Sequence, residues 1–199
     1  VCAEKQQGTE FKYSDAGYCV LQLLLQELEQ KPFEDVAQEM IFIPLSLNNT
    51  FFASPNNIAH YERKSIMATG YDENGHAIPG KYPQIPDLAA SGLWSTPKEL
   101  LIIAKEFVKA CNGQSSLLKE KNAMEIVKPV EQFQWTGLGV FIGGENEIVS
   151  RGWGENGQSM MKINYRTGEI AVVMTNQNPG VDQSESGIEW LVNNQCNIQ

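Results

Sequence analysis

The sequence predicts an α+β protein: a helical segment, then an antiparallel sheet meander, then a C-terminal helix. Up to about residue 128, apolar residues recur mostly with the spacing of helices. After Pro129 this period changes to that of strands, and a last helical run closes the chain. No repeat or low-complexity segment appears. Helices and strands therefore occupy separate parts of the sequence.

The first predicted helix covers residues 15–30, where nearly every position is apolar. Such a helix should be buried on most of its sides. The polar cluster Tyr13-Ser14-Asp15 precedes it. Either Ser14 or Asp15 would cap the helix, with Tyr13 packing beside its start.

Further helices flank a long irregular stretch. An amphipathic helix is expected from about Pro32 to Phe42, closed before Pro44. Residues 46–91 are rich in Pro, Gly, Asn and Asp, which predicts a loop that carries functional surface or wraps a larger partner domain. The string STPKE at 95–99 then begins a helix: its Thr is an N-cap, its Pro fits the first turn and its Glu completes a capping box. A short helix follows at about 119–126.

The closing part of the chain reads as strands with one helix. Arg166-Thr167-Gly168 is a plausible hairpin turn between the last two strands, and SESGIEWLVNNQ is the final helix. The strand candidates are WTGLGVFIG, EIVSRGW, QSMMKINY and EIAVVMTN.

Composition excludes several classes of function. The formal charge is −9, and Lys and Arg are outnumbered and scattered, so a nucleic-acid surface is not expected. No apolar stretch is long enough to span a bilayer. The chain does not begin with Met, so a targeting signal could precede it and the compartment stays open.

Metal and cofactor sites are not expected either. The cysteines form no C-x-x-C pair, and phosphate or dinucleotide fingerprints are missing. Cys19 should pack as a small apolar residue in its helix. Cys2 and Cys196 could pair only if the two ends of the chain meet.

Local motifs do not supply a nucleophile. His60 and His76 lie in the loop region, and without a G-x-S-x-G elbow they do not indicate a Ser-His-Asp triad. Two Ser-x-x-Lys strings, 95–98 and 116–119, would place an amine beside a hydroxyl on one helical turn. The first straddles the capping box and the second precedes an ordinary short helix. Since the pattern fixes only two common residues, both are interpreted as chance matches.

Tyr13 has a second interpretation besides packing. Its phenol could lie at the mouth of a cleft, where a neighbouring ammonium would lower its pKa and let it shuttle a proton. The cap and the proton shuttle are compatible.

Several stretches, in order, resemble the serine β-lactamase and penicillin-binding-protein-like hydrolases, closest to the class C β-lactamase, D-peptidase and esterase group. The match spans almost all 199 residues. It implies a partial β-lactamase/transpeptidase-like fold that lacks its N-terminal strands and nucleophile helix. In that fold, residues 1–130 would be the mostly helical part and residues 131–199 the strands and last helix, together one partial domain. The matching stretches are FKYSDAGYCVLQ, KPFEDVAQEMIFIPLSLNNTFF with Ser46 in place of a glycine, AASGLWSTPKELLIIAKEF, GLGVFI, SRGWGENGQSMM and TGEIAVVMTNQNPG.

The resemblance assigns catalytic roles to the opening cluster. Tyr13 matches the tyrosine of the Tyr-x-Asn element, which helps to activate the serine and protonates the leaving group. Asp15 stands where Asn or Ser is common, and would orient the substrate or pair with the lysine. Such a pair could shift the preference from lactams towards other substrates.

The third family element, Lys/His-x-Gly, corresponds to Arg151-Gly152-Trp153-Gly154, which we expect to bind substrate. Two registers are open. Either Gly152-Trp153-Gly154 fills the motif and the cation is lost, or Arg151 supplies the charge and Trp153 replaces the glycine. The first keeps the family's glycine spacing through Gly157. Trp153 could also simply pack against the core.

The Ser-x-x-Lys segment that the family places before Tyr-x-Asn is not in this sequence. We therefore expect the C-terminal portion of a hydrolase that acts on D-amino-acid peptides, esters or lactams, inactive alone and without a cofactor. The alternative is a non-catalytic binding or scaffold relic; a self-contained enzyme using Ser95 or Ser116 is the third hypothesis.

Expected partners are a small-molecule or peptide substrate and either the missing N-terminal half or a second copy, through exposed apolar surface. A bacterial extracytoplasmic location is expected if the full-length protein carries a signal.

Overall fold

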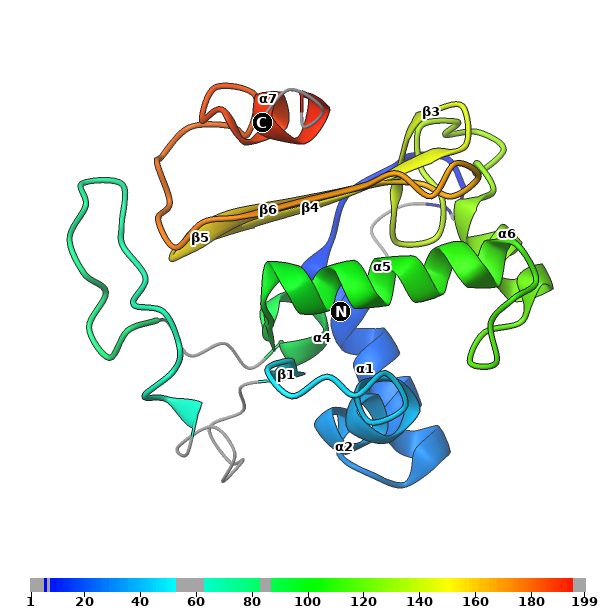
Figure 1. Cartoon of the computed structure of the whole chain (residues 1–199), viewed down its shortest axis with the longest axis horizontal. Coiled ribbons are helices and arrows are strands. Elements are labelled where there is room, and N and C mark those ends of the chain that lie inside the picture. Colours follow the sequence, from blue (N-terminus) through cyan, green and yellow to red (C-terminus); the bar gives the residue numbers. More distant parts are fainter. Residues whose placement is uncertain (1–5, 7, 53–62, 83–86, 195–199) are drawn as a thin grey trace.

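The structure is a computed structural model that describes residue 6 and residues 8–52, 63–82 and 87–194 (Figure 1). An antiparallel sheet lies between helix α7 on one face and helices α5 and α6 on the other. Helices α1 and α2 lie farther from the sheet, beyond α5. His60, Cys2 and Cys196 fall outside the described residues, so the predictions for them are not tested.

The sheet is a simple meander, as the sequence predicts. Its strands are β3 (Phe141–Gly144), β4 (Glu147–Gly154), β5 (Gly157–Asn164) and β6 (Ile170–Met174). Neighbours in sequence pair antiparallel in the order β3-β4-β5-β6. The first strand is shorter than expected, because the residues before Phe141 form turns and isolated bridges.

The turn between β5 and β6 confirms the predicted hairpin. Gly168 has φ +80°, a left-handed conformation that glycine adopts without strain. The side-chain oxygen of Asn164 accepts hydrogen bonds from the backbone N–H groups of Arg166 and Thr167. These contacts fix the register in which β6 returns along β5.

Both faces of the sheet are covered by helices that bury small and branched residues. Helices α5 (Pro97–Cys111) and α6 (Glu120–Val127) pack on one face, and α7 (Ile188–Asn193) packs on the other. The core on the α5 side consists of Ala104, Ala110, Cys111, Ala123, Val127, Ile148 and Ile163. The core on the α7 side consists of Val149, Met160, Ala171, Ile188 and Val192.

The start of α5 confirms one half of the predicted capping box and corrects the other. The Thr96 hydroxyl accepts a hydrogen bond from the backbone N–H of Glu99 (3.2 Å). The Glu99 carboxylate does not return to Thr96. It accepts bonds from the backbone N–H groups of Asn48 and Asn49 and from the Thr50 hydroxyl, at 2.6–3.0 Å. Glu99 thus ties a distant loop to the helix.

Helix α1 (Asp15–Glu29) differs from its predicted environment. Ser14 occupies the N-cap position, but its side chain makes no capping hydrogen bond, so that part of the prediction is wrong. None of the residues of α1 is buried, and the expectation of a mostly buried helix is wrong for the described chain. The expected exposed apolar surface is present. It comprises Val20, Leu21, Leu23, Leu24, Leu25 and Leu28.

The second predicted helix is broken in two. Helix α2 (Phe33–Ala37) is followed directly by a π-helical turn, η1 (Gln38–Phe42), instead of running on as one α-helix. Its exit is tight: Ser46 has φ +56°, and the N–H of Leu47 donates to the carbonyl of Phe42 (2.9 Å). The residue that replaces a family glycine therefore adopts a backbone conformation that suits glycine.

The long segment 46–91 contains short regular elements where the structure describes it. Strand β1 (Phe51–Phe52) pairs antiparallel with β2 (Leu93–Trp94), just after helix α4 (Leu88–Ser91). A loop around Tyr71 bridges to Gln177 beyond β6. The segment thus reaches from the helical layer to the end of the sheet.

Candidate functional site

Tyr13 lies on the segment that leads from the sheet to α1. Two residues earlier, the Phe11 ring packs edge-on against Phe133 and Trp135, with centroids 5.9 and 4.4 Å away. Trp135 in turn stacks on Phe141 of β3 (6.1 Å). Figure 1 shows this blue segment running from near β3 to the start of α1. An aromatic anchor on one side and a helix start on the other therefore position Tyr13.

Tyr13 is 58% exposed, and its phenol interacts with Asp15. Partial burial raises the pKa of Tyr13, and the charge of the Asp15 carboxylate and its hydrogen bond to the phenol raise it further. A phenol with a raised pKa is a weaker acid that stays protonated at neutral pH, and it leaves almost no phenolate to act as a base. A cation beside it would be needed to reverse the direction of the pKa shift.

Helix α1 meets two other segments of the chain just after Tyr13. A Cβ on Gly139, whose φ is +74°, would come within 3.4 Å of the Tyr18 hydroxyl oxygen, so the helix abuts this turn closely. One turn further, the Gln22 side-chain oxygen accepts from the backbone N–H of Ala89 in α4 (2.9 Å).

The predicted substrate motif lies at the end of β4, and its residues alternate between the two faces of the sheet. Arg151 points to the α7 face, where its guanidinium bonds the Glu189 carboxylate (3.0 Å). Trp153 lies on the same face by strand alternation. It is 52% exposed and donates from Nε1 to Asn178 Oδ1 (3.1 Å), so the interpretation that it packs in the core is wrong. The positions of Gly152 and Gly154 face the α5 side.

Gly152 has a steric reason to be glycine. A Cβ there would lie 2.4 Å from the Ser159 hydroxyl oxygen across the ladder. From the other face, the Gln183 amide nitrogen donates to the carbonyl oxygens of both Gly152 and Ser159, at 2.8 Å each. Gln183 is only 2% exposed. This buried amide holds the β4–β5 pair in place at the motif.

The outer edge of β4 is open beyond the part that pairs with β3. Strand β3 contacts β4 only at residues 147–149, while β5 pairs along 147–154. Hydrogen-bonded pairs alternate along an antiparallel ladder. The backbone of Gln158, which lies opposite Trp153, bonds towards β6, so this pair is not hydrogen-bonded across β4 and β5. The backbone groups of Trp153, and of Arg151 two residues earlier, therefore point outward. Within the described ranges no backbone group pairs with them. An extended peptide could add here as a further strand.

The Ser-x-x-Lys strings remain interpreted as chance matches. The Ser95 hydroxyl lies 2.7 Å from that of Thr50, which donates to Glu99, so Ser95 belongs to a structural network. Lys98 is exposed and Ser116 lies on the surface. His76 is exposed and contacts Asp72 within its own turn (3.4 Å).

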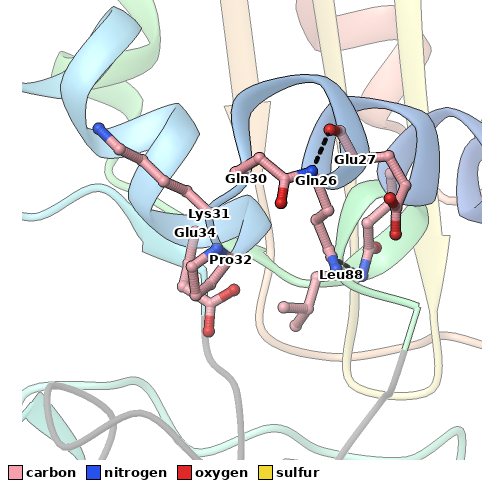
Figure 2. A pocket seen from close by; sticks show the side chains of 8 residues that line it. Gln26, Glu27, Gln30, Lys31, Pro32, Glu34 and Leu88 are labelled. Atoms are coloured by element: carbon pink, nitrogen blue, oxygen red, sulfur yellow. Dashed lines mark hydrogen bonds between the residues drawn. The ribbon is translucent and has the colours of Figure 1, made fainter.

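An open hollow of about 450 Å³ lies elsewhere, between α1, α2 and α4 (Figure 2). None of the candidate site residues lines it. Among the described residues, no group of three or more His, Cys, Asp or Glu side chains could hold a metal ion, and no helix combines the length and apolarity needed to cross a membrane. The lining residues are Gln22, Gln26, Glu27, Gln30, Lys31, Pro32, Glu34 and Leu88.

Three residues near the motif were not anticipated from the sequence: Asn178, Gln183 and Glu189. They come from the loop after β6 and from α7, and they reach β4 only through the fold. A loop glutamine, asparagine or glutamate carries no local signal of such a contact.

Comparison with known proteins agrees with the fold. The beta-lactamase family model matches residues 3–192. The D-amino acid amidase of Ochrobactrum anthropi SV3 aligns with TM-score 0.73 and 20% identity over 96% of this chain and 59% of that chain. A penicillin-binding protein from Bacillus halodurans aligns with TM-score 0.72 and 19% identity over 94% and 58%. No match was found among curated proteins.

A third structure has the same fold but a much longer chain. The octameric penicillin-binding protein homologue from Pyrococcus abyssi aligns with TM-score 0.74 and 20% identity over 95% of this chain and 43% of that one. The chain therefore spans less than two thirds of these relatives. The predicted partial β-lactamase/transpeptidase-like fold is confirmed.

Proposed function

Because this chain belongs to the beta-lactamase family, we propose that it forms the C-terminal part of a serine hydrolase that cleaves D-amino-acid peptides or amides, esters or lactams. In the proposed reaction, a serine oxygen bonds to the substrate carbonyl carbon, the leaving group departs with a proton, and water hydrolyses the resulting ester. The serine and its lysine come from sequence outside these 199 residues. The chain alone is therefore expected to be inactive.

The open edge of β4 is the observation that carries this proposal. The outward backbone groups of Arg151 and Trp153 offer hydrogen bonds to an extended substrate backbone. Trp153, half-exposed on the α7 face at this end of β4, provides apolar contact area. Gly152 leaves no side chain on the opposite face. Such an edge suits a peptide-like substrate better than a compact one.

Tyr13 takes the proton-transfer role in this proposal. Its raised pKa keeps the phenol protonated at neutral pH, so it carries the proton that the leaving group takes up. To accept a proton from the serine it needs a neighbouring ammonium, which the lysine of a Ser-x-x-Lys segment would supply. Asp15, next to the phenol, would hold that ammonium in place. Proton transfer in both directions then requires both parts of the enzyme.

One observation favours the second candidate, a non-catalytic binding protein. The charge of Arg151 is engaged by Glu189 on the α7 side, so the motif has lost or redirected its cation. Such a chain would bind an extended peptide along β4 without cleaving it.

The test is turnover by the chain alone and mixed with the N-terminal part of a related enzyme that carries Ser-x-x-Lys. Substrates are nitrocefin, p-nitrophenyl acetate and a D-phenylalanine anilide. We expect turnover only in the mixture, reduced at least 100-fold by Tyr13→Phe, the size of a general acid–base contribution. Tyr18→Phe is the matched control and should retain most of the activity.

Each result decides between the candidates. Turnover by the chain alone would contradict the proposed division of the active site and revive Ser95 and Ser116 as nucleophiles. Association of the two parts, shown by size-exclusion chromatography, without turnover would favour the binding protein. Equal loss in the Tyr13 and Tyr18 variants would remove the specific role of Tyr13.

A further inference from the structure

The sequence contains three Asn-Gly pairs, at 74–75, 112–113 and 156–157. In such a pair the backbone nitrogen of the glycine can bond to the side-chain carbonyl carbon of the asparagine, because glycine has no Cβ to hinder the approach. All three pairs lie at turns of the chain. The contacts around each asparagine therefore decide which of them can react.

Asn112 is held by its own side-chain hydrogen bonds. Its amide nitrogen donates to the backbone carbonyls of Val108 (2.7 Å) and Tyr165 (2.8 Å). Its Oδ1 accepts from the Arg166 guanidinium (3.4 Å). The N–H of Gly113 is also bonded, to a carbonyl of the last turn of α5 (3.1 Å). A reaction between Asn112 and Gly113 would have to break all these bonds.

Asn156 is held by packing at the tip of the β4–β5 hairpin. The ladder behind it consists of eight residue pairs. A Cβ on Gly70 would lie 2.4 Å from the Cβ of Asn156, so the two segments touch directly. A Cβ on Gly157 would lie 2.3 Å from the carbonyl oxygen of Thr175. The backbone around this pair therefore has little room to move.

Asn74 lies in a turn that is held mainly by Asp72. The N–H of Gly75 donates to the Asp72 carbonyl (3.0 Å), and the N–H groups of Asn74 and His76 donate to Asp72 Oδ1 (2.9 and 2.8 Å). Within the described residues, no hydrogen bond holds the side-chain amide of Asn74. The antiparallel ladder behind the turn has one described pair. Opening this turn therefore breaks fewer interactions than opening either of the others.

We propose that Asn74 is a site of spontaneous deamidation, which converts it to aspartate or isoaspartate while Asn112 and Asn156 stay intact. The Gly75 nitrogen loses its proton and bonds to Cγ of Asn74, and the amide nitrogen leaves as ammonia. Water then opens the cyclic imide. Attack at Cγ gives aspartate, and attack at the main-chain carbonyl gives isoaspartate. The reaction needs no oxidant or reductant, and it does not depend on the proposed hydrolase.

The modification should loosen the turn in which it occurs. It adds a negative charge beside Asp72 and Glu73, and like charges at such short range repel. Isoaspartate also adds an atom to the main chain, which moves the N–H groups that Asp72 Oδ1 accepts from. The Glu73 carboxylate lies against Gly180, where a Cβ would come within 2.8 Å of Glu73 Oε2. Loosening the turn therefore also disturbs its contact with the loop after β6.

The first test compares the three asparagines in the native and the denatured chain. The chain is incubated in water labelled with heavy oxygen, with or without guanidinium chloride, and the label at each site is measured by peptide mass spectrometry. In guanidinium the three sites should react at similar rates, since each precedes glycine. In the native chain, Asn74 should react within about threefold of its denatured rate, and Asn112 and Asn156 at least about tenfold more slowly than theirs.

The second test detects isoaspartate with an isoaspartyl methyltransferase and a radiolabelled methyl donor. Aged wild-type chain should accept the label. Asn74→Gln should remove most of it, because a glutamine side chain would have to form a larger ring. Asn156→Gln is the matched control and should accept as much label as the wild-type chain.

Each outcome supports or overturns the assignment. Equal rates at the three sites of the native chain would overturn it. So would a native rate at Asn74 that is slowed as much as the rate at Asn112, since the turn would then be closed. Labelling that persists in Asn74→Gln, or that falls equally in both variants, would also overturn it.

Discussion

Helices α1 and α5 are the same length, 15 residues each, and both are rich in apolar side chains. Helix α5 packs against the sheet and α6, and buries Ala104, Ala110 and Cys111. Helix α1 buries none of its residues, although it carries several leucines. The difference lies in what surrounds each helix. An apolar helix needs a covering surface, and the described chain supplies one for α5 only.

The comparison predicts very different costs for removing an apolar side chain. Ile163 is 3% exposed beneath α5. Changing it to Ala should lower the unfolding free energy of the protein by about 3 kcal/mol, because the substitution leaves a cavity that the surroundings fill only in part. Leu28 of α1 is 68% exposed, and changing it to Ala should lower the unfolding free energy by less than about 0.5 kcal/mol. Urea denaturation followed by circular dichroism measures both. Similar losses at the two sites would show that α1 is covered in solution.

Helix α5 also differs from α1 in having a buried carboxylate, that of Glu99, whereas α1 has no buried side chain. Burial alone would raise its pKa, but hydrogen bonds from Thr50, Asn49 and Asn48 outweigh this effect and lower it. Glu99→Gln should cost about 2 kcal/mol of unfolding free energy, since an amide cannot accept from all these donors. Thr96→Ser, which keeps the cap, is the control.

The lowered pKa of Glu99 also gives a pH dependence with a definite sign. Its stabilising contribution is fully present above the ordinary pKa of a glutamate in the unfolded chain. It is lost as the pH falls through the lower pKa of the folded state. The wild-type chain should therefore lose more stability on acidification than Glu99→Gln. Parallel urea titrations of the two proteins that show equal acid sensitivity would contradict this account.

Ser46 lies between the α1–α2 region and the loop that Glu99 holds. Its φ of +56° is unfavourable for a residue with a Cβ. Ser46→Gly should therefore raise the unfolding free energy by about 1 kcal/mol. Ser116→Gly, at a surface position without positive φ, should be neutral or slightly destabilising. A loss of stability in Ser46→Gly would show that the serine makes a compensating contact.

The smallest expected effect concerns the ion pair between Arg151 and Glu189, whose side chains are 38% and 30% exposed. A double-mutant cycle with Arg151→Met and Glu189→Gln should give a coupling of about 0.5 kcal/mol that weakens with added salt. A coupling several times larger and independent of salt would mean that the pair is buried by a partner in solution.

The sequence predicted the regular elements well where their signals are local. The meander from β3 to β6, the hairpin at Gly168 and the Thr96 cap follow from strand periodicity, turn residues and capping chemistry. Predictions that needed a distant partner were less successful. The Glu99 contact and the environment of Trp153 both depend on segments far away in the sequence.

In the candidate site, too, the sequence predicted some residues, while contacts with distant segments could not be predicted from it. The sequence identified Tyr13, Asp15 and the stretch 151–154 through resemblance, and their catalytic roles stay predictions. The sequence did not indicate that Arg151 turns to Glu189 or that Gln183 holds the motif. These contacts arise when the loop after β6 folds back over the sheet.

The sequence by itself determined the order of helices and strands, the meander and the family, because periodicity, turns and ordered motifs are written in neighbouring residues. The tertiary structure alone decided which apolar helix is covered, which carboxylate is buried and which strand edges stay open. These properties depend on the surface that each element meets after folding. A leucine in α1 and an isoleucine beneath α5 are both apolar in sequence, and their different environments exist only in the folded chain.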